Sequence, residues 1–305
     1  IAARRSSPLV IGLGDNEYFI ASDATPIVEY TDRVIYLNND DIALIRKDEL
    51  VLKNLTSDNT RVNIKTLDLG IAEIEKQGFD HFMLKEIFEQ PRSIQDTFRG
   101  RILPDKQLIK LGGLLDVKDQ LVKSNRIIII ACGTSWHAGL VGECLLEDLA
   151  RIPVEVEYAS EFRYRNPMIG PGDVVLAISQ SGETADTLAA IQLAKEAGTL
   201  VLGICNVAGS SISRETHAGV YTHAGTEIGV ASTKAFTAQV TVLTMMAMMI
   251  GREKGNLSEA RFSELITELN NVPGKIEKIL KQNEEFKRIA EIYKDATNAL
   301  YLGRG

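Results

Sequence analysis

Residues 174–197 carry the pattern that most restricts how this chain can fold. An apolar run, Val174 to Ile178, leads into the turn Ser-Gln-Ser-Gly-Glu-Thr at residues 179–184, and a helix-forming stretch, Thr187 to Ala197, follows at once. At such a strand-to-helix turn the free backbone N–H groups point towards one place, and the helix dipole adds partial positive charge there. The pattern predicts a βα unit with an anion site at its turn.

The side chains of this turn favour phosphate as the anion. Ser179, Ser181 and Thr184 supply hydroxyl donors, and Gly182 lets a ligand approach the backbone closely. The turn contains no lysine, so it differs from the Gly-Lys-Ser/Thr loop that binds nucleoside triphosphates. The alternative is that the hydroxyls only cap the helix. We predict a phosphate cradle built from neutral donors.

Strands and helices alternate from about residue 118 onwards, which predicts an α/β fold with a parallel sheet and right-handed crossovers. The run from Arg126 to Ala131 is continuously apolar after its first residue, as in a strand buried on both faces. We expect further strands at residues 154–158, 174–178, 200–205 and 219–223, and helices at residues 136–150, 187–197 and 234–249.

Two other turns are candidates for the same site. Cys132–Ser135 follows the first apolar strand, and because ligands bind beyond the carboxyl ends of parallel strands, it would face the 179–184 turn if the two strands are neighbours. Two hydroxyl-rich turns together favour a phosphate site over simple helix capping. Gly229–Lys234 opens the helix at residues 234–249, where an anion site and a capped helix start are equally supported.

Isolated reactive side chains give weaker signals. Cys132 has no base placed beside it by the sequence, so a small residue at a strand end is favoured over a nucleophile. His137 lies one turn into a helix and is interpreted as a packing or surface residue. Glu183 is the only acid in the cradle and could transfer a proton or stabilise the first helical turn. Three cysteines and four histidines show no metal-binding spacing.

The regions flanking the parallel sheet have different patterns. Residues 1–58 contain short strands separated by Asn, Asp and Gly turns, which predicts one sheet or a sandwich layer. Residues 258–296 are expected to be helical with a break at Pro273. A connector lies between residues 1–58 and the parallel sheet. We expect it to contain a helix from residue 81 that stops at Pro91 and a second short helix at residues 93–99. The apolar residues of the first helix are Phe82, Leu84, Ile87 and Phe88.

Charge and hydropathy exclude several classes of function. The net charge of −7 argues against a general surface for nucleic acid or acidic membranes. The longest apolar run, Val240 to Ile250, is too short to span a bilayer. No signal-peptide layout is present, and unpaired cysteines indicate a reducing cytoplasm. The chain starts without Met and ends with an apolar strand entering a glycine turn, which suggests a piece of a longer protein.

Several segments together resemble the glutamine–fructose-6-phosphate aminotransferases (isomerizing), the glucosamine-6-phosphate synthase family. The resemblance covers nearly the whole chain. The sugar-isomerase (SIS) motif alone would identify only a superfamily, whereas its combination with the preceding region is specific. The segments that carry the resemblance are Cys132–Ser135, Ser179–Thr187, Gly225–Phe236, Ala159–Arg165, Lys85–Pro91 and Pro8–Gly14.

The resemblance implies a division of the chain. The family has an N-terminal-nucleophile glutaminase domain followed by two SIS domains. Residues 1–58 would be the C-terminal tail of the glutaminase domain, and residues 59–115 a helical connector. Residues 116–258 would form the first, flavodoxin-like SIS domain. Residues 259–305 would hold a helical linker and the first strand of a truncated second SIS domain.

The resemblance also implies which residues bind fructose 6-phosphate. No metal or redox cofactor is implied. The family's glutaminase cysteine and the glutamate, histidine and lysine of its isomerase half fall outside the matched positions, so no catalytic residue is predicted here. This polypeptide by itself is predicted to be inactive. The predicted phosphate-binding residues are Thr134, Ser135, Ser179, Gln180, Ser181 and Thr184, and the predicted sugar-lining residues are Val230, Ala231 and Ser232.

The function implied for the intact protein belongs to hexosamine biosynthesis. It would hydrolyse glutamine, pass ammonia to fructose 6-phosphate and release glucosamine 6-phosphate and glutamate, as a cytoplasmic homodimer paired through its isomerase domains. One alternative is a sugar-phosphate-sensing regulatory module, but such sensors usually join a helix-turn-helix segment, whereas residues 1–58 are β-rich. A stand-alone phosphosugar isomerase, the other alternative, would not carry the glutaminase tail.

Overall fold

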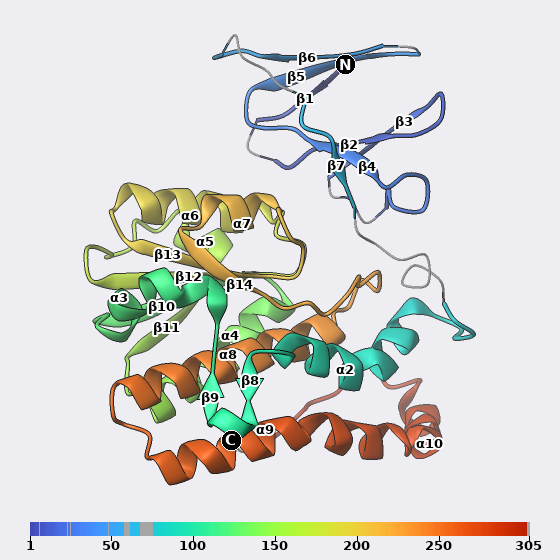
Figure 1. The fold of residues 1–305 in the computed structure, drawn as a ribbon. Helices are drawn as coiled ribbons and strands as arrows, with labels where there is room; N and C mark the ends of the chain where they lie inside the picture. The colour runs from blue at the N-terminus through green and yellow to red at the C-terminus, as the bar shows by residue number, and fades with distance from the viewer. Residues whose placement is uncertain are drawn as a thin grey trace.

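The chain folds into a smaller β-rich part and a larger α/β part, seen at the top and bottom of Figure 1. The structure is a computed structural model. It describes residues 1–303 except Ser6, Asp23, Thr25, Asp48 and the ranges 58–61 and 68–75.

Two small antiparallel sheets form the β-rich part. Their strand orders are β1-β5-β6 and β3-β2-β4-β7. Ile11 and Ile35 of one sheet cluster with Ala2 and Ala43 of the other, so the two sheets share one core. The predicted strands are confirmed, although they form two packed sheets instead of one. The strands are β1 Ala2–Ala3, β2 Val10–Leu13, β3 Tyr18–Ala21, β4 Arg33–Tyr36, β5 Asp41–Arg46, β6 Glu49–Asn54 and β7 Lys65–Thr66.

A five-stranded parallel sheet forms the centre of the α/β part, with strand order β11-β10-β12-β13-β14. This is the 2-1-3-4-5 order of flavodoxin-like folds, as predicted. Alternate residues of β10 enter two separate cores, one on each face of the sheet, which explains the continuous apolar run. The strands are β10 Arg126–Ala131, β11 Val154–Tyr158, β12 Asp173–Ser179, β13 Leu200–Cys205 and β14 Ala218–Tyr221.

Helices cover both faces of this sheet (Figure 1). Helices α4 and α8 pack on one face, with α9 outside them against α2 (Phe82–Phe98) and α8, and α5, α6 and α7 pack on the other face. The helices are α3 Lys118–Val122, α4 Thr134–Leu145, α5 Ala159–Phe162, α6 Ala185–Glu196, α7 Ser211–Glu215, α8 Lys234–Glu253, α9 Glu259–Leu280 and α10 Asn283–Tyr293. A π-helical turn, η3 Leu146–Ala150, extends α4.

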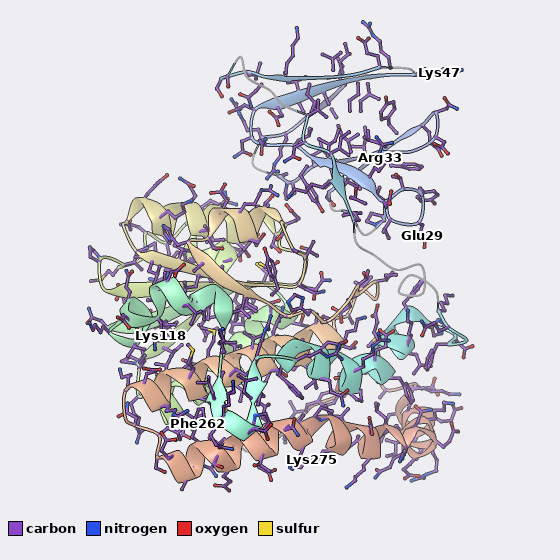
Figure 2. All side chains as sticks on the ribbon, viewed as in Figure 1. Glu29, Arg33, Lys47, Lys118, Phe262 and Lys275 are labelled. Carbon is purple, nitrogen blue, oxygen red and sulfur yellow. The ribbon has the colours of Figure 1, made fainter. Side chains whose placement is uncertain are left out.

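Helix α8 lies in the core, and its four methionines are buried there. Among the described residues it is the one helix long and apolar enough to cross a bilayer, but 78% of its apolar window is buried inside the protein, as in a core helix. Helix α9 is amphipathic: Phe262 is buried in the same core, whereas Lys275 is exposed (Figure 2).

The connector contains one long helix, α2 Phe82–Phe98, which runs through Pro91. The predicted stop at Pro91 is therefore wrong, and so is the separate helix at residues 93–99. Pro91 has no N–H for the carbonyl of Ile87, but the Gln90 side chain donates to that carbonyl at 3.0 Å. This substitute bond lets the helix continue.

The expected break at Pro273 is also wrong. Helix α9 passes through Pro273 and ends at Leu280. Pro273 is buried, so packing on the rest of the protein offsets the lost helical bond. The remaining connector holds the short hairpin β8 Ile102–Leu103 and β9 Leu108–Ile109 with the 3₁₀ turns η1 Pro104–Lys106 and η2 Gly112–Val117.

Candidate functional site

The two hydroxyl-rich turns leave the same edge of the parallel sheet. Strands β10 and β12 are neighbours, with Ala131 paired to Ile178 at their carboxyl ends. The turn at residues 132–135 and the turn at residues 179–184 therefore start side by side. This juxtaposition, expected only if the strands were adjacent, is confirmed.

The turn at residues 179–184 is folded by its own hydroxyl groups. Ser179 Oγ accepts a hydrogen bond from Gly182 N at 3.0 Å and lies 3.1 Å from Thr184 Oγ1. Ser181 Oγ accepts from Glu183 N at 3.2 Å. Ser179 is buried, whereas Gln180, Ser181 and Thr184 remain partly exposed. The inner hydroxyl thus shapes the turn, and the outer ones stay accessible to a ligand.

Gly182 is required by this geometry. Its φ is +68°, in the left-handed region that favours glycine. A Cβ at this position would lie 2.0 Å from Ser210 Oγ and 2.5 Å from Ser210 Cβ. The turn can therefore close against Ser210 only if residue 182 lacks a side chain.

Neither helix that follows these turns has a side-chain cap. The N-cap of α4 is Gly133, which has no side chain to offer, and the hydroxyl of Thr184, the N-cap of α6, caps no backbone N–H group. The Thr184 hydroxyl instead contacts Ser179. Simple capping, the alternative to a ligand site, is therefore not what these hydroxyls do. The positive ends of both helices face the same edge of the sheet.

The 132–135 turn places its residues differently. Thr134 is exposed, and Ser135 is buried with its Oγ accepting from Gln239 Nε2 of α8 at 3.0 Å. His137 is exposed, with its Nδ1 3.1 Å from Gly133 O, which agrees with a surface role. Cys132 is half-buried at the strand end.

Glu183 points away from the open side of the cradle. Its Oε1 accepts from Ser211 N at 2.8 Å, and the residue is 7% exposed. Arg4 of the β-rich part donates to Ser211 Oγ at 3.3 Å. The carboxylate therefore anchors the turn to α7 instead of facing a ligand. The β-rich part meets the α/β part behind the cradle.

The third candidate turn, Gly229–Lys234, follows and overlaps a loop, residues 225–233, that is held by a carboxylate. Glu227 Oε1 accepts from Thr233 N at 2.7 Å and from Ala235 N at 3.2 Å. Because this carboxylate occupies the start of α8, the capped helix start is the correct interpretation of that position, and the anion-site interpretation is not. The predicted sugar-lining residues Val230 and Ala231 are exposed, and Ser232 is partly exposed.

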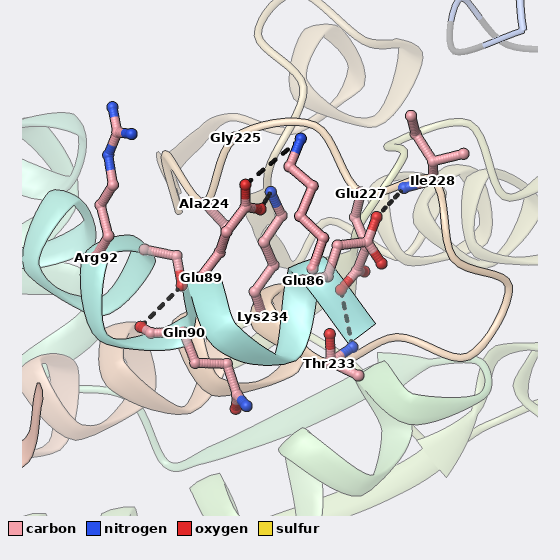
Figure 3. A network of polar contacts seen from close by, with 12 residues as sticks. Glu86, Glu89, Gln90, Arg92, Ala224, Gly225, Glu227, Ile228, Thr233 and Lys234 are labelled. Atoms are coloured by element: carbon pink, nitrogen blue, oxygen red, sulfur yellow. Dashed lines mark hydrogen bonds and ion pairs between the residues drawn. The ribbon is translucent and has the colours of Figure 1, made fainter. Parts of the chain in front are cut away.

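Sequence reasoning missed the charged residues of α2 that contact this loop. The four apolar residues noted in this helix are only partly buried, whereas Lys85 and Glu86 are each 2% exposed. The Glu86 carboxylate accepts from Ile228 N at 2.5 Å and from Gly229 N at 3.1 Å (Figure 3). In the sequence, only the family resemblance of the Lys85–Pro91 segment pointed to this helix. The Ile228 N–H group that bonds to Glu86 lies 142 residues away in the chain.

Electrostatics distinguish the buried titratable groups. Burial raises the pKa of Glu86, and the nearby charge of Glu227 raises it further. The hydrogen bonds from Ile228 and Gly229 and the charge of Lys234 lower this pKa. Burial raises the pKa of the Cys205 thiol to about 12, so this cysteine is not a nucleophile at neutral pH. Within the described ranges, His, Cys, Asp and Glu side chains form no group of three that could hold a metal ion.

Comparison with known proteins gives one consistent result. Residues 120–249 match the SIS domain family. The chain is 56% identical over its whole length to glutamine–fructose-6-phosphate aminotransferase [isomerizing] of Bacteroides thetaiotaomicron, of which it covers 50%. The same enzyme of Chlorobaculum tepidum is also 56% identical and is also covered to 50%. The chain thus spans about half the length of the curated relatives it matches.

A solved structure agrees with these sequences. The C-terminal domain of glucosamine-fructose-6-phosphate aminotransferase from Francisella tularensis superimposes with a TM-score of 0.71 at 38% identity. The match covers 76% of this chain and 65% of the solved chain.

Proposed function

We propose that the chain belongs to the glutamine–fructose-6-phosphate aminotransferase family, which its 56% identity to two such enzymes supports, and that it forms the sugar-phosphate-binding part of the enzyme. The intact enzyme makes glucosamine 6-phosphate and glutamate from fructose 6-phosphate and glutamine. One observation carries the assignment of the site: two helix starts without side-chain caps and the exposed or partly exposed hydroxyls of Thr134, Ser181 and Thr184 meet at one edge of the sheet.

The phosphate group of the substrate occupies this edge. Backbone N–H groups and hydroxyls donate to its oxygens, and the dipoles of α4 and α6 add favourable charge. The residues that bind the phosphate are Thr134, Ser135, Ser179, Gln180, Ser181 and Thr184, and the sugar lies against Val230, Ala231 and Ser232.

The cradle anchors the substrate and performs no proton transfer itself. Isomerisation of a ketose requires a base that removes a carbon-bound proton, and hydroxyls and N–H groups do not accept a proton at neutral pH. Holding the phosphate fixes the position of the sugar carbons, which lowers the entropic cost of the reaction carried out by other groups.

The β-rich part belongs to the glutaminase domain of the intact enzyme in this proposal. The pairing of β7 with β4 supports extending this unit from residue 58 to residue 66. The connector to residue 115, the SIS domain at residues 116–258 and the linker at residues 259–305 complete the division. The intact enzyme is a cytoplasmic homodimer that also binds glutamine.

Calorimetric titration tests the proposal. The 305-residue chain should bind fructose 6-phosphate and should not bind fructose measurably. Ser181→Ala removes one donor to a charged group, which should weaken binding of fructose 6-phosphate about tenfold or more. Equal affinities of the wild type and Ser181→Ala for fructose 6-phosphate would remove the cradle assignment.

A further inference from the structure

We propose that Glu86 is a positioning residue for the sugar-lining loop, residues 228–232, and that it controls how tightly the sugar is held without affecting the phosphate. The inference deepens the proposed function and rests on it. It assigns a role in substrate specificity to a side chain that no ligand has to touch.

The contact joins two segments that are far apart in the chain. Glu86 on α2 and Ile228 are 142 residues apart, yet the carboxylate accepts hydrogen bonds from Ile228 N at 2.5 Å and from Gly229 N at 3.1 and 3.2 Å. Both N–H groups lie directly before Val230, the first of the predicted sugar-lining residues. The carboxylate therefore fixes the backbone at the point where the loop turns towards the ligand.

Gly229 shows how closely the loop fits this carboxylate. A Cβ on Gly229 would lie 2.5 Å from Glu86 Oε2 and 3.3 Å from Met83 Cα. The backbone of the loop thus rests directly on the first turn of α2. A side chain at residue 229 would therefore force the loop and the Glu86 carboxylate apart.

The loop is anchored at two points with an exposed span between them. Glu86 holds Ile228 and Gly229 at one end, and Glu227 holds Thr233 N at the other. Between the anchors Val230 is fully exposed, so its own packing cannot define its position. The conformation of the span is set by the two carboxylates.

Ion pairs also fix the position of α2, and so of Glu86, relative to α8. Lys234, the first residue of α8, donates to Glu89 at 2.7 Å, and the Lys85 Nζ lies 3.5 Å from Glu89 (Figure 3). Lys85 and Lys234 are both buried, at 2% and 4% exposure, so the lysine side of these pairs is shielded from solvent, whereas Glu89 is 27% exposed. Figure 3 shows Lys234 meeting Glu89, and Glu86 on the same helix pointing separately to Ile228 of the loop. The helix therefore presents a rigid carboxylate to the loop.

Ligand binding can distinguish a positioning role of Glu86 from a general role in stabilising the fold. Hydroxyl groups of the phosphate cradle itself shape the turn at residues 179–184. None of these hydrogen bonds involves Glu86. If Glu86 acts on the sugar-lining loop, its loss should weaken binding of a hexose 6-phosphate and leave inorganic phosphate binding unchanged. If it only stabilises the fold, both ligands should respond alike.

The experiment titrates the 305-residue chain with fructose 6-phosphate and, separately, with inorganic phosphate. Glu86→Ala leaves two N–H groups without an acceptor, and fructose 6-phosphate affinity should fall about tenfold while phosphate affinity stays within about twofold. Glu86→Gln keeps an acceptor oxygen and should restore most of the sugar affinity. Asp96→Ala is the control, since Asp96 is a carboxylate at the other end of the same helix, where it forms ion pairs with Arg92 and Arg99.

A second variant covers the case in which Glu86→Ala does not fold. Gly229→Ala keeps every charge but displaces the loop from the carboxylate, so the same selective loss of sugar affinity is expected. Parallel losses for both ligands, or no loss for either, in folded variants would overturn the role of Glu86. A wild-type chain that binds neither ligand would overturn the proposed function itself, which separates the two failures.

Discussion

The turn at residues 179–184 and the loop at residues 225–233 both precede a helix of the α/β part, but they are stabilised in opposite ways. The first is shaped by hydroxyls from within its own six residues and is attached to α7 through the Glu183–Ser211 bond. The second depends on carboxylates, one of them 142 residues earlier in the chain. A change on α2 should therefore alter the loop, which α2 holds, more than it alters the turn. The predictions below test this contrast.

The largest expected effect comes from filling the space at Gly182. In Gly182→Ala the new Cβ would meet both Ser210 Oγ and Ser210 Cβ, and rotation of the hydroxyl relieves only one contact. Together with the backbone strain at φ +68°, the free energy of unfolding should fall by about 3 kcal/mol. Urea unfolding followed by circular dichroism measures this.

A matched glycine separates the two causes. Gly198 has φ +76°, and a Cβ there would have no atom within 4 Å. Gly198→Ala should therefore cost only the backbone strain, about 1 kcal/mol. An equal decrease in the free energy of unfolding for the two variants would show that the close packing of the turn against Ser210 does not contribute to stability.

The second prediction concerns the hydroxyl that closes the turn. Ser179→Ala removes the acceptor for Gly182 N and the contact with Thr184, so the whole cradle loosens. Affinities for fructose 6-phosphate and inorganic phosphate should both fall about tenfold or more. This parallel loss is the opposite of the selective loss expected for Glu86→Ala. If calorimetry showed Ser179→Ala to be selective for the sugar, the two sites would not be separable.

The contrast also explains what could be predicted from the sequence. The parallel sheet followed from strand and helix periodicity, and the cradle from hydroxyls in one short turn, because each of these patterns lies within a short segment. The burial of Glu86 could not be foreseen, since its partners Ile228 and Gly229 come together with it only in the folded chain.

The two misplaced helix ends have the same explanation. A proline is normally read as a helix stop, but the Gln90 side chain replaces the bond lost at Pro91, and Pro273 is buried against the protein. Both compensations come from side-chain geometry and packing. Periodicity and breaker residues alone contain no information on them.

A third prediction uses pH to test the distant anchor. The pKa of Glu86 is raised, mainly by burial and also by the charge of Glu227. The hydrogen bonds from Ile228 and Gly229 and the charge of Lys234 lower the pKa, but not enough to cancel this rise. The folded protein therefore binds this proton more tightly than the unfolded chain does. Its contribution to stability is complete below the ordinary carboxyl pKa and is lost as the pH rises through the raised pKa.

Glu86→Gln removes this titration. The unfolding free energy of the wild type, relative to Glu86→Gln, should decrease as the pH is raised from about 4 to about 7. Lys85 and Glu89 on the same helix are common to both proteins, so their titration cancels in the difference. A difference that stays constant with pH would mean that the Glu86 carboxyl has the same pKa in the folded and unfolded chains.

The smallest effect is expected at Glu183, the acid that lies within the cradle sequence. Its carboxylate bonds to Ser211 N and faces away from the open side of the turn, and a glutamine oxygen can accept the same bond. Glu183→Gln should therefore change fructose 6-phosphate affinity by less than about threefold. The 305-residue polypeptide by itself should neither hydrolyse glutamine nor interconvert fructose and glucose 6-phosphates above a heat-treated control. Turnover that disappeared in Glu183→Gln would show that this carboxylate reaches the substrate and acts as its base. The cradle would then be a catalytic centre, and the division between a locally closed binding turn and a distantly anchored specificity loop would fail.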